Sequence, residues 1–243
     1  MIYNDRTLTI IDYESEQIAN LTLPDGLVAI AFSAGYDSTA LFYTICQYIT
    51  DLNLESRITI LPVHHWYSSQ IDMFDKCEFI IEQIKKRYPN ITIEETEVYF
   101  DNTLYANQRN LHKVYWKDLF QRYPDIQYLV KGKMNGPPKD VLDSWPAGWW
   151  HFDWQNVLKS PPEYEYDGKV KHYHPFFNID KRITKKIFDY LDIPKVVYNT
   201  IRACEADYGF MRREEYRHTP YFLEKPCEGC LPCLQKKWAF GEF

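Results

Sequence analysis

One stretch, residues 27–48 (LVAIAFSAGYDSTALFYTICQY), constrains the fold more than any other part of the chain. Residues 27–32 form a continuous apolar run, which is typical of a strand buried on both faces, and residues 40–48 are apolar at helical spacing. A tight turn from a strand into a helix gathers unpaired backbone N–H groups and the positive end of a helix dipole at one point. The sequence between the two elements therefore predicts an anion site, such as a site for phosphate.

The turn itself reads Ser33-Ala34-Gly35-Tyr36-Asp37-Ser38-Thr39. Gly35 lets the backbone bend and approach a ligand closely, and the three hydroxyl side chains add hydrogen-bond donors. A carboxylate such as Asp37 suits a phosphate site only if it caps the helix or shares a divalent cation with the phosphates. The residues alone leave two interpretations open: a ligand site, or a corner in which Ser and Asp merely cap the helix.

The order of elements predicts an α/β fold with a parallel sheet. Expected strands at 57–64, 91–100 and 127–132 alternate with helical patterns at 69–88 and 102–123, and such alternation implies crossover connections. The ligand site of such a sheet lies outside the carboxyl ends of its strands. We therefore expect the turn, His64-His65, residues 100–109 and residues 131–135 to border one crevice. Before this unit, alternating runs at 7–12 and 18–23 predict a small hairpin or edge extension.

Regular patterning stops between residues 133 and 172, a stretch that contains four tryptophans and five prolines. Long loops without elements of their own are usually functional or disordered, and this many aromatic side chains argue against disorder. The stretch fits a lid that stacks on a purine-like ring, a packed irregular subdomain, or the interface of a homodimer. After it, Asp180 is a plausible N-cap of a helix that runs through Leu191, and Pro194 starts a second short helix.

Composition restricts the class of protein. Of the 243 residues, 45% are hydrophobic and 17% aromatic, as in a folded globular protein. No apolar run is long enough to cross a membrane and the N-terminus does not resemble a signal peptide, so we expect a cytoplasmic protein. The formal net charge of −6 argues against extensive nucleic-acid binding, which relies on Lys and Arg neutralising phosphates.

Four cysteines gather near the C-terminus: Cys204, Cys227, Cys230 and Cys233. The last three follow one another at two-residue intervals, so that a turn can direct their sulfurs at one tetrahedral ion, with Cys204 as the fourth ligand. In a reducing compartment this spacing favours a structural Zn²⁺ site; an iron–sulfur cluster is the main rival. The predicted organisation is thus 1–26 as an extension, 27–200 as the α/β domain, and 201–243 as a small zinc-binding subdomain.

The turn resembles the Ser-Gly-Gly-X-Asp-Ser signature of the PP-loop ATP pyrophosphatase family, a Rossmann-like fold, and matches it at Ser33, Gly35, Asp37 and Ser38. Ala34 stands where the family has its second glycine; a positive φ there would strain an alanine. The resemblance implies that ATP and Mg²⁺ bind here. The residues implied in binding are Ser33, Ala34, Gly35, Tyr36, Asp37, Ser38, Thr39, His64 and Gly132.

Residues 175–181 and 189–204, the cysteine motif and residues 236–240 resemble, in the same order, the C-terminal half of 7-cyano-7-deazaguanine synthases, a branch of that family. Arg109-Asn110 resembles a pair that the branch carries near its third helix. Two substrate-side motifs are missing: Asp-Tyr-Gly-Gln-Arg-His after the second strand and Pro-Asp-Cys after the fourth. The ATP chemistry therefore carries over better than the identity of the acceptor.

This resemblance implies an ATP-dependent C–N ligase that adenylates a carboxylate or amide oxygen for attack by ammonia, as in queuosine and 7-deazaguanine biosynthesis. The substrate would be 7-carboxy-7-deazaguanine or a similar carboxylate. The implied catalytic residues are Asp37, Ser38, Lys131, Lys181 and Arg109. The alternatives are tRNA thiolation, a related modification of a protein or nucleotide in phage defence, and a non-catalytic nucleotide-binding zinc protein.

Overall fold

A seven-stranded sheet forms the centre of the molecule in a computed structural model that describes residues 1–67, 73–101, 108–145, 163–166, 170–201, 228 and 231–241. Its order is β6-β5-β4-β8-β10-β9, and β7 also pairs with β5. All pairings are parallel except that of β9 with β10. The strands are β4 (Gly26–Ala31), β5 (Ile58–Tyr67), β6 (Thr92–Ile93), β7 (Glu97–Asp101), β8 (Tyr128–Lys131), β9 (Glu163–Tyr166) and β10 (Val170–Tyr173).

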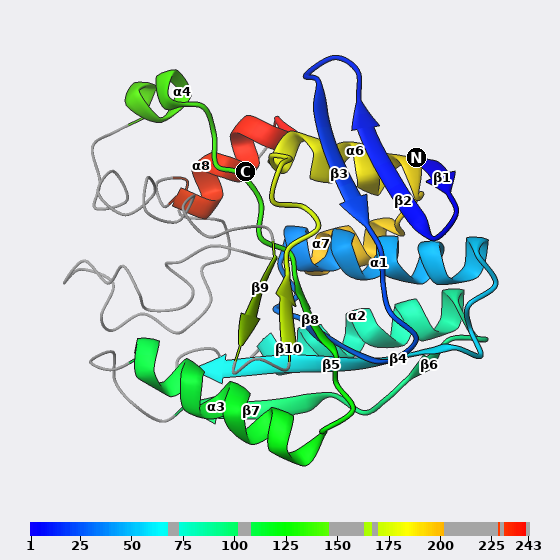
Figure 1. The fold of residues 1–243 in the computed structure, drawn as a ribbon. Coiled ribbons are helices and arrows are strands. Elements are labelled where there is room, and N and C mark those ends of the chain that lie inside the picture. The colour runs from blue at the N-terminus through cyan, green and yellow to red at the C-terminus, as the bar shows by residue number, and fades with distance from the viewer. Residues whose placement is uncertain are drawn as a thin grey trace.

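Helices cover both faces of this sheet (Figure 1). One face packs against α1 (Tyr36–Asp51), α2 (Met73–Arg87), α6 (Lys181–Tyr190) and α7 (Lys195–Thr200), and the other against α3 (Gln108–Arg122). Each face has its own apolar core, because successive side chains of a strand point to opposite sides. The predicted Rossmann-like α/β fold, a largely parallel sheet flanked by helices, is therefore confirmed.

A separate three-stranded antiparallel sheet precedes the central one, with β1 (Ile2–Asn4), β2 (Thr7–Asp12) and β3 (Gln17–Leu21) in that order. Its alternating residues place Leu8, Ile10, Ala19 and Leu21 in the same core as α1 and α6. Lys186 of α6 contacts Asp12 at 2.6 Å, and the Tyr48 hydroxyl of α1 donates to the Arg6 carbonyl at 2.8 Å. These contacts join the N-terminal sheet to the helices that lie over the central sheet.

Two details differ from the sequence prediction. The single strand expected at 91–100 is two strands, β6 and β7, which pair with successive parts of β5. Residues 94–96 break the strand between them. The second difference is that the stretch 133–172, predicted to lack regular structure, contains α4 (Lys139–Ser144), β9 and most of β10. Strand β10 pairs with β8 in parallel. The residues of β10, VKHY, alternate in burial in the structure. One of the two buried residues is the polar His172, so the polarity of the sequence does not predict a strand here.

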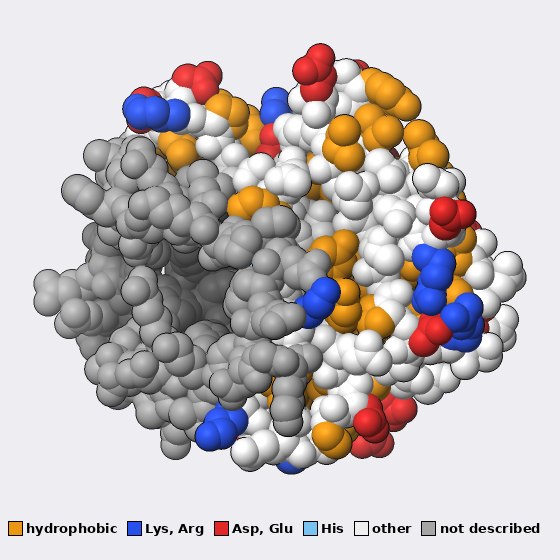
Figure 2. All heavy atoms as spheres, in the orientation of Figure 1, with side chains coloured by type: hydrophobic (Ala, Val, Ile, Leu, Met, Phe, Trp, Pro, Cys, Tyr) orange, Lys and Arg blue, Asp and Glu red, His pale blue; other side chains and the backbone are white. Residues whose placement is uncertain are grey.

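In the view of Figure 2, the described residues form no broad basic face, and their basic side chains lie scattered among acidic ones. Apolar side chains gather over the N-terminal sheet, where Ile2, Tyr13 and Ile18 are exposed. Across the described parts of the chain, we find no helix with the length and apolar character that a membrane span requires.

Candidate functional site

The turn between β4 and α1 lies at the carboxyl edge of the sheet, as predicted. Ala34 is fully buried and has a φ of +51°, which is in the left-handed region that favours glycine. The strain anticipated for an alanine at this position is therefore present. Gly35 is the N-cap of α1, and no side chain caps the helix. The first-turn N–H groups of α1 thus retain the capacity to bind an anion.

Two serine hydroxyls close this turn. The Oγ atoms of Ser33 and Ser38 are 3.1 Å apart, and Ser38 Oγ also donates to the Gly35 carbonyl at 3.1 Å. The Ser33 N–H donates to Ser38 Oγ at 3.3 Å. Ser33 is exposed whereas Ser38 is buried, so Ser38 fixes the shape of the turn and Ser33 offers its hydroxyl to a ligand.

Gly132, which follows β8, packs directly against the first turn of α1. A Cβ added to Gly132 would lie 2.8 Å from the Asp37 carbonyl carbon and 2.9 Å from the Ser38 nitrogen. Real Cβ atoms do not approach backbone this closely, so only glycine allows β8 and α1 to meet here. The structure therefore gives Gly132 a packing role beside the turn, in addition to its predicted place at the ligand site.

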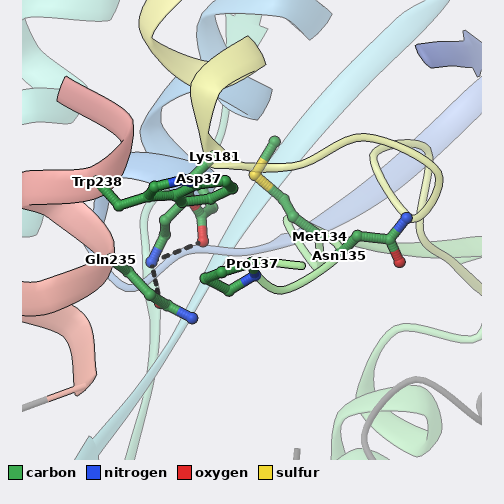
Figure 3. Close-up of a pocket in the computed structure, with 7 residues that line it drawn as sticks. All are labelled: Asp37, Met134, Asn135, Pro137, Lys181, Gln235 and Trp238. Carbon is green, nitrogen blue, oxygen red and sulfur yellow. Dashed lines mark hydrogen bonds and ion pairs between the residues drawn. The ribbon is translucent and has the colours of Figure 1, made fainter. Parts of the chain in front are cut away.

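A small pocket adjoins the turn, and Figure 3 shows its lining. Lys181, the first residue of α6, extends its Nζ to 3.5 Å from Asp37 Oδ2 and donates to Gln235 Oε1 at 2.8 Å. The volume of about 20 Å³ suits one water molecule or a monatomic ion. The residues that line the pocket are Asp37, Met134, Asn135, Pro137, Lys181, Gln235 and Trp238.

The environment of Asp37 is partly buried and perturbs its carboxyl group. Its side chain keeps 26% of its surface exposed, but protein surrounds the rest. Burial raises the pKa of the Asp37 carboxyl, and the ammonium of Lys181 and the hydroxyl of Thr184 oppose this shift. Asp37 Oδ1 is buried and has no hydrogen-bond partner among the described residues. A carboxylate oxygen in that state fits a divalent cation, because such an ion would supply the missing partner.

Three other predicted binding residues face protein. The Tyr36 ring packs among aromatic rings of α6, α7 and α8 (Leu231–Phe240), with the Phe240 ring centroid at 4.8 Å. Thr39 is fully buried, and its Oγ1 has no hydrogen-bond partner in the described part of the chain. His64 of β5 is 1% exposed, and its Nδ1 lies 2.9 Å from the Phe32 carbonyl oxygen and 3.3 Å from Cys77 Sγ. These residues support the turn from within.

Lys131 lies at the carboxyl end of β8 but points away from this pocket. Val130 belongs to the core on the α1 side and Leu129 to the core on the α3 side, so alternation directs Lys131 toward α3. Its Nζ lies 3.1 Å from His172 Nδ1 of β10 and 4.8 Å from the Trp116 ring centre of α3. The structure therefore separates Lys131 from Lys181, although the sequence suggested one shared role.

The N-terminus of α6 is anchored so that Lys181 has a fixed position. Asp180 caps the helix, as predicted, by accepting from the Arg182 N–H at 2.9 Å. The Gln17 side chain of the N-terminal sheet donates to Asp180 Oδ2 and accepts from the Asp180 N–H, both at 2.7 Å. The Arg182 guanidinium stacks 4.8 Å from the Trp238 ring centre of α8. Together these contacts hold α6 and α8 around the pocket.

The C-terminal helix α8 (Leu231–Phe240) carries one of the predicted zinc ligands. Cys233 lies in its first turn and is buried. Cys204, Cys227 and Cys230 lie outside the described residues, so the four-cysteine site stays a prediction. Among the residues that the structure describes, no cluster of His, Cys, Asp and Glu suits a metal ion. Arg109 lies in the first turn of α3, and its side chain is outside the described part of the chain.

Comparisons with known proteins found similarity to solved structures only. No protein-family model and no curated protein matches the chain. An FMN adenylyltransferase from Candida glabrata, in complex with FMN and an ATP analogue, is 13% identical with a TM-score of 0.42 and covers 67% of this chain and 48% of its own. The U34-tRNA thiolase NcsA from Methanococcus maripaludis, with its 4Fe-4S cluster, is 13% identical with a TM-score of 0.42 and covers 87% of this chain and 80% of its own.

These matches do not identify a reaction. The chain spans about half the length of the adenylyltransferase, and at a TM-score of 0.42 neither similarity carries an argument. A functional proposal must therefore rest on the turn and its surroundings.

Sequence reasoning missed three residues of this edge: Gln235 in the pocket, and Trp116 and His172 beside Lys131. Asn135, which lines the pocket, belongs to the range 131–135 expected there. His172 had no local signal, because VKHY does not alternate in polarity, and packing between distant elements brings Trp116 and Gln235 to the edge.

Proposed function

We propose that the chain is an ATP-dependent enzyme of the PP-loop type, which activates a carboxylate or amide oxygen as an adenylate for attack by a nitrogen nucleophile. One observation carries the proposal: the uncapped N-terminus of α1, closed by two serine hydroxyls, lies beside Lys181, which the fold holds 3.5 Å from Asp37. This arrangement combines anion-binding N–H groups, a fixed cation and a carboxylate at one edge of the sheet.

In the proposed reaction, the acceptor oxygen attacks the α-phosphorus of ATP and pyrophosphate leaves. The N–H groups of α1 and the Ser33 hydroxyl bind the pyrophosphate, and Lys181 compensates the negative charge that develops on it. Asp37, whose Oδ1 has no partner among the described residues, would hold Mg²⁺, which neutralises phosphate charge. The nitrogen nucleophile then attacks the activated carbon, and AMP leaves with the oxygen.

The finer proposal follows the resemblance found in the sequence. The acceptor is 7-carboxy-7-deazaguanine and the nucleophile is ammonia, whose attack on the adenylate gives the amide and AMP. A second ATP then adenylates the amide oxygen with release of pyrophosphate, and loss of AMP and protons from this adenylate gives the nitrile. In this proposal, Cys204, Cys227, Cys230 and Cys233 hold a structural Zn²⁺ in the C-terminal segment. Helix α8 of the same segment lines the pocket. Gln235, two residues after Cys233, contacts Lys181, so the metal would stabilise one wall of the pocket.

The test is incubation of the full chain with ATP, Mg²⁺, ammonium and 7-carboxy-7-deazaguanine, with mass spectrometry for the nitrile. We expect nitrile formation that depends on ATP and is lost in Ser38→Ala. Ser56→Ala, which changes an exposed serine in the turn before β5, is the matched control and keeps full activity.

The outcomes separate the function classes. Ser38-dependent ATP consumption without nitrile would leave the ATP chemistry in place and overturn this acceptor. ATP binding without Ser38-dependent turnover would make the chain a nucleotide-binding module. Sulfur transfer to tRNA requires redox-active cysteines, so a tightly bound and non-exchanging zinc would exclude that alternative.

A further inference from the structure

We propose that Lys131, positioned by His172 and Trp116, forms a second anion subsite on the α3 side of the sheet edge together with Lys133, whose Nζ lies 5.8 Å from the Phe177 ring centre. The subsite takes an oxyanion group of a bound substrate, either a carboxylate or a phosphate. It lies on the other side of the sheet from the pocket formed by Asp37 and Lys181. The naming of the acceptor as its ligand rests on the proposed function, whereas the anion subsite itself does not.

The ammonium group of Lys131 is held in a defined position. His172 Nδ1 accepts one N–H at 3.1 Å, and the Trp116 ring centre lies 4.8 Å from Nζ. The His172 ring itself is fixed, because the rings of Trp116 and Phe120 contact it edge-on at centroid distances of 6.1 and 6.2 Å. An ammonium has three donors, and in the described residues only His172 accepts from this one. With respect to the described residues, two donors are therefore left for a ligand.

Among the described residues, no carboxylate compensates the charge of this corner. None pairs with Lys131 or Lys133, although Lys181, Lys185 and Lys186 of α6 each have one. Burial and the neighbouring charge of Lys133 lower the pKa of Lys131 to about 8. Both like charge and burial disfavour an ammonium, and a bound oxyanion would relieve both effects.

His172 cannot itself supply the negative partner or a second cation. Burial, Lys131 and His174 lower the pKa of His172 to about 3, so its imidazole is neutral at pH 7. A neutral imidazole that accepts from Lys131 orients the ammonium without adding charge. His172 is therefore a positioning residue, and the two lysines are the groups that contact the anion.

The subsite is close enough to the turn for one ligand to reach both. Lys131 is the register partner of Ala31, two residues before Ser33, and the next residue, Gly132, touches the backbone of Asp37 and Ser38. A substrate that crosses the edge of the sheet can thus place one end at the turn and an oxyanion at Lys131. This geometry points to an acceptor that carries an anionic oxygen group.

The test measures binding to the full chain by calorimetry, with three probes used separately: 7-carboxy-7-deazaguanine, ATP with Mg²⁺, and inorganic pyrophosphate. For the probe whose oxyanion occupies the subsite, Lys131→Gln should weaken binding by roughly tenfold to a hundredfold, as expected for loss of a hydrogen bond to a charged group. Lys131→Arg should retain most of the affinity. Lys85→Gln, an exposed lysine of α2, is the charge-matched control and should have no effect.

A second measurement keeps the test independent of folding in the variants. The wild-type chain is labelled with limiting acetic anhydride, with and without each probe, and the modification of Lys131 is quantified by mass spectrometry. We expect at least one probe to protect Lys131 while Lys85 stays equally reactive. The protecting probe identifies the source of the oxyanion: the carboxylate compound indicates the acceptor, and ATP or pyrophosphate indicates a phosphate.

Failure is distinguishable from failure of the proposed function. The subsite is overturned if none of the probes protects Lys131 and none loses affinity in Lys131→Gln. The proposed function fails if the wild type consumes no ATP, whatever the result at Lys131. Anion binding that depends on Lys131 but not on Ser38 would support the subsite in either case.

Discussion

The two sides of one sheet edge place a partly buried lysine in opposite electrostatic environments. On the α1 side, Lys181 faces the Asp37 carboxylate and the Gln235 amide oxygen. On the α3 side, Lys131 faces a neutral imidazole, an aromatic ring and a second lysine, with no carboxylate among the described residues. The first lysine has its counter-charge built into the fold. The second has a fixed position and no counter-charge among the described residues, so a bound anion would supply one.

This difference assigns different tasks to the two sides. A lysine paired with a carboxylate acts in a site where charge develops during the reaction, since its own charge is stabilised before the ligand arrives. A desolvated lysine without a partner binds an anion more strongly, because binding also removes an unfavourable state. The comparison predicts that changes on the α1 side affect turnover most and changes on the α3 side affect binding.

The largest effect is expected for Lys181→Gln. Loss of this cation should lower the kcat for ATP consumption by roughly 10²–10³-fold, the range typical for loss of one preorganised group at developing charge. Lys185→Gln removes a lysine that pairs with Asp189 on the same helix and is the control. Steady-state kinetics with both variants measures the difference. Equal kcat values for the two variants would break the assignment of Lys181 to the α1-side site.

A large effect on stability is expected for Gly132→Ala. The added Cβ would meet the Asp37 backbone at 2.8 Å, so β8 and α1 must move apart. Overpacking of this kind should lower the free energy of unfolding by about 1–3 kcal/mol. Urea denaturation checks this. Gly35→Ala is the control, because its Cβ meets only Ser33 Oγ, at 3.4 Å; if it were equally destabilising, the contact at Gly132 would not be the cause.

The α3 side predicts a pH dependence of stability. The pKa of Lys131 falls from 10.5 to about 8 on folding, so between these values the folded chain binds fewer protons than the unfolded chain. The contribution of Lys131 to the free energy of unfolding therefore rises with pH through this window, by at most about 1.4 kcal/mol per pH unit. The dependence fades below pH 8 and is nearly absent at about pH 7, where Lys131 is protonated in both states.

Urea denaturation of the wild type and Lys131→Met at pH 7, 8 and 9 isolates the contribution. We expect the wild type to gain stability relative to the variant between pH 8 and 9, and Lys85→Met to behave as the wild type. A difference between wild type and Lys131→Met that does not change with pH would show that the ammonium is not desolvated.

The smallest effect is expected for Ala34→Gly. Glycine relieves about 1–2 kcal/mol of left-handed strain at the φ of +51°. It also loses about 0.8 kcal/mol from the buried methyl group and about 0.4–1 kcal/mol from the added freedom of the unfolded chain. The free energy of unfolding should therefore change by less than about 1 kcal/mol. Ala40→Gly, buried within α1 without such strain, should be clearly destabilising; equal effects would contradict a strained Ala34.

Local patterns predicted the elements that position the site. The apolar runs around residues 33–39 define β4 and α1 to within a few residues, and Asp180 is the N-cap of α6 as expected. The parallel pairing of β4 with β5 and β8 agrees with the predicted alternation of strands and helices, because that alternation implies crossover connections. The order of the strands was not part of the prediction.

The side on which each lysine lies could not be predicted. Leu129 and Val130 are both apolar, so the sequence of β8 does not tell which of its faces meets α1 and therefore where Lys131 points. Gln235 reaches Lys181 across 54 residues of sequence, and such contacts leave no local pattern. The sequence does not reveal the φ of Ala34. It predicts only that a positive φ at this position would strain an alanine.

The measurement that most directly tests the ATP chemistry is ³¹P NMR of the products formed by wild type and Ser38→Ala from ATP, Mg²⁺, ammonium and 7-carboxy-7-deazaguanine. The account predicts AMP and pyrophosphate with the wild type, since the site binds the pyrophosphate that leaves the α-phosphorus, and no products with Ser38→Ala. ADP and phosphate, or equal product formation by the two proteins, would contradict it.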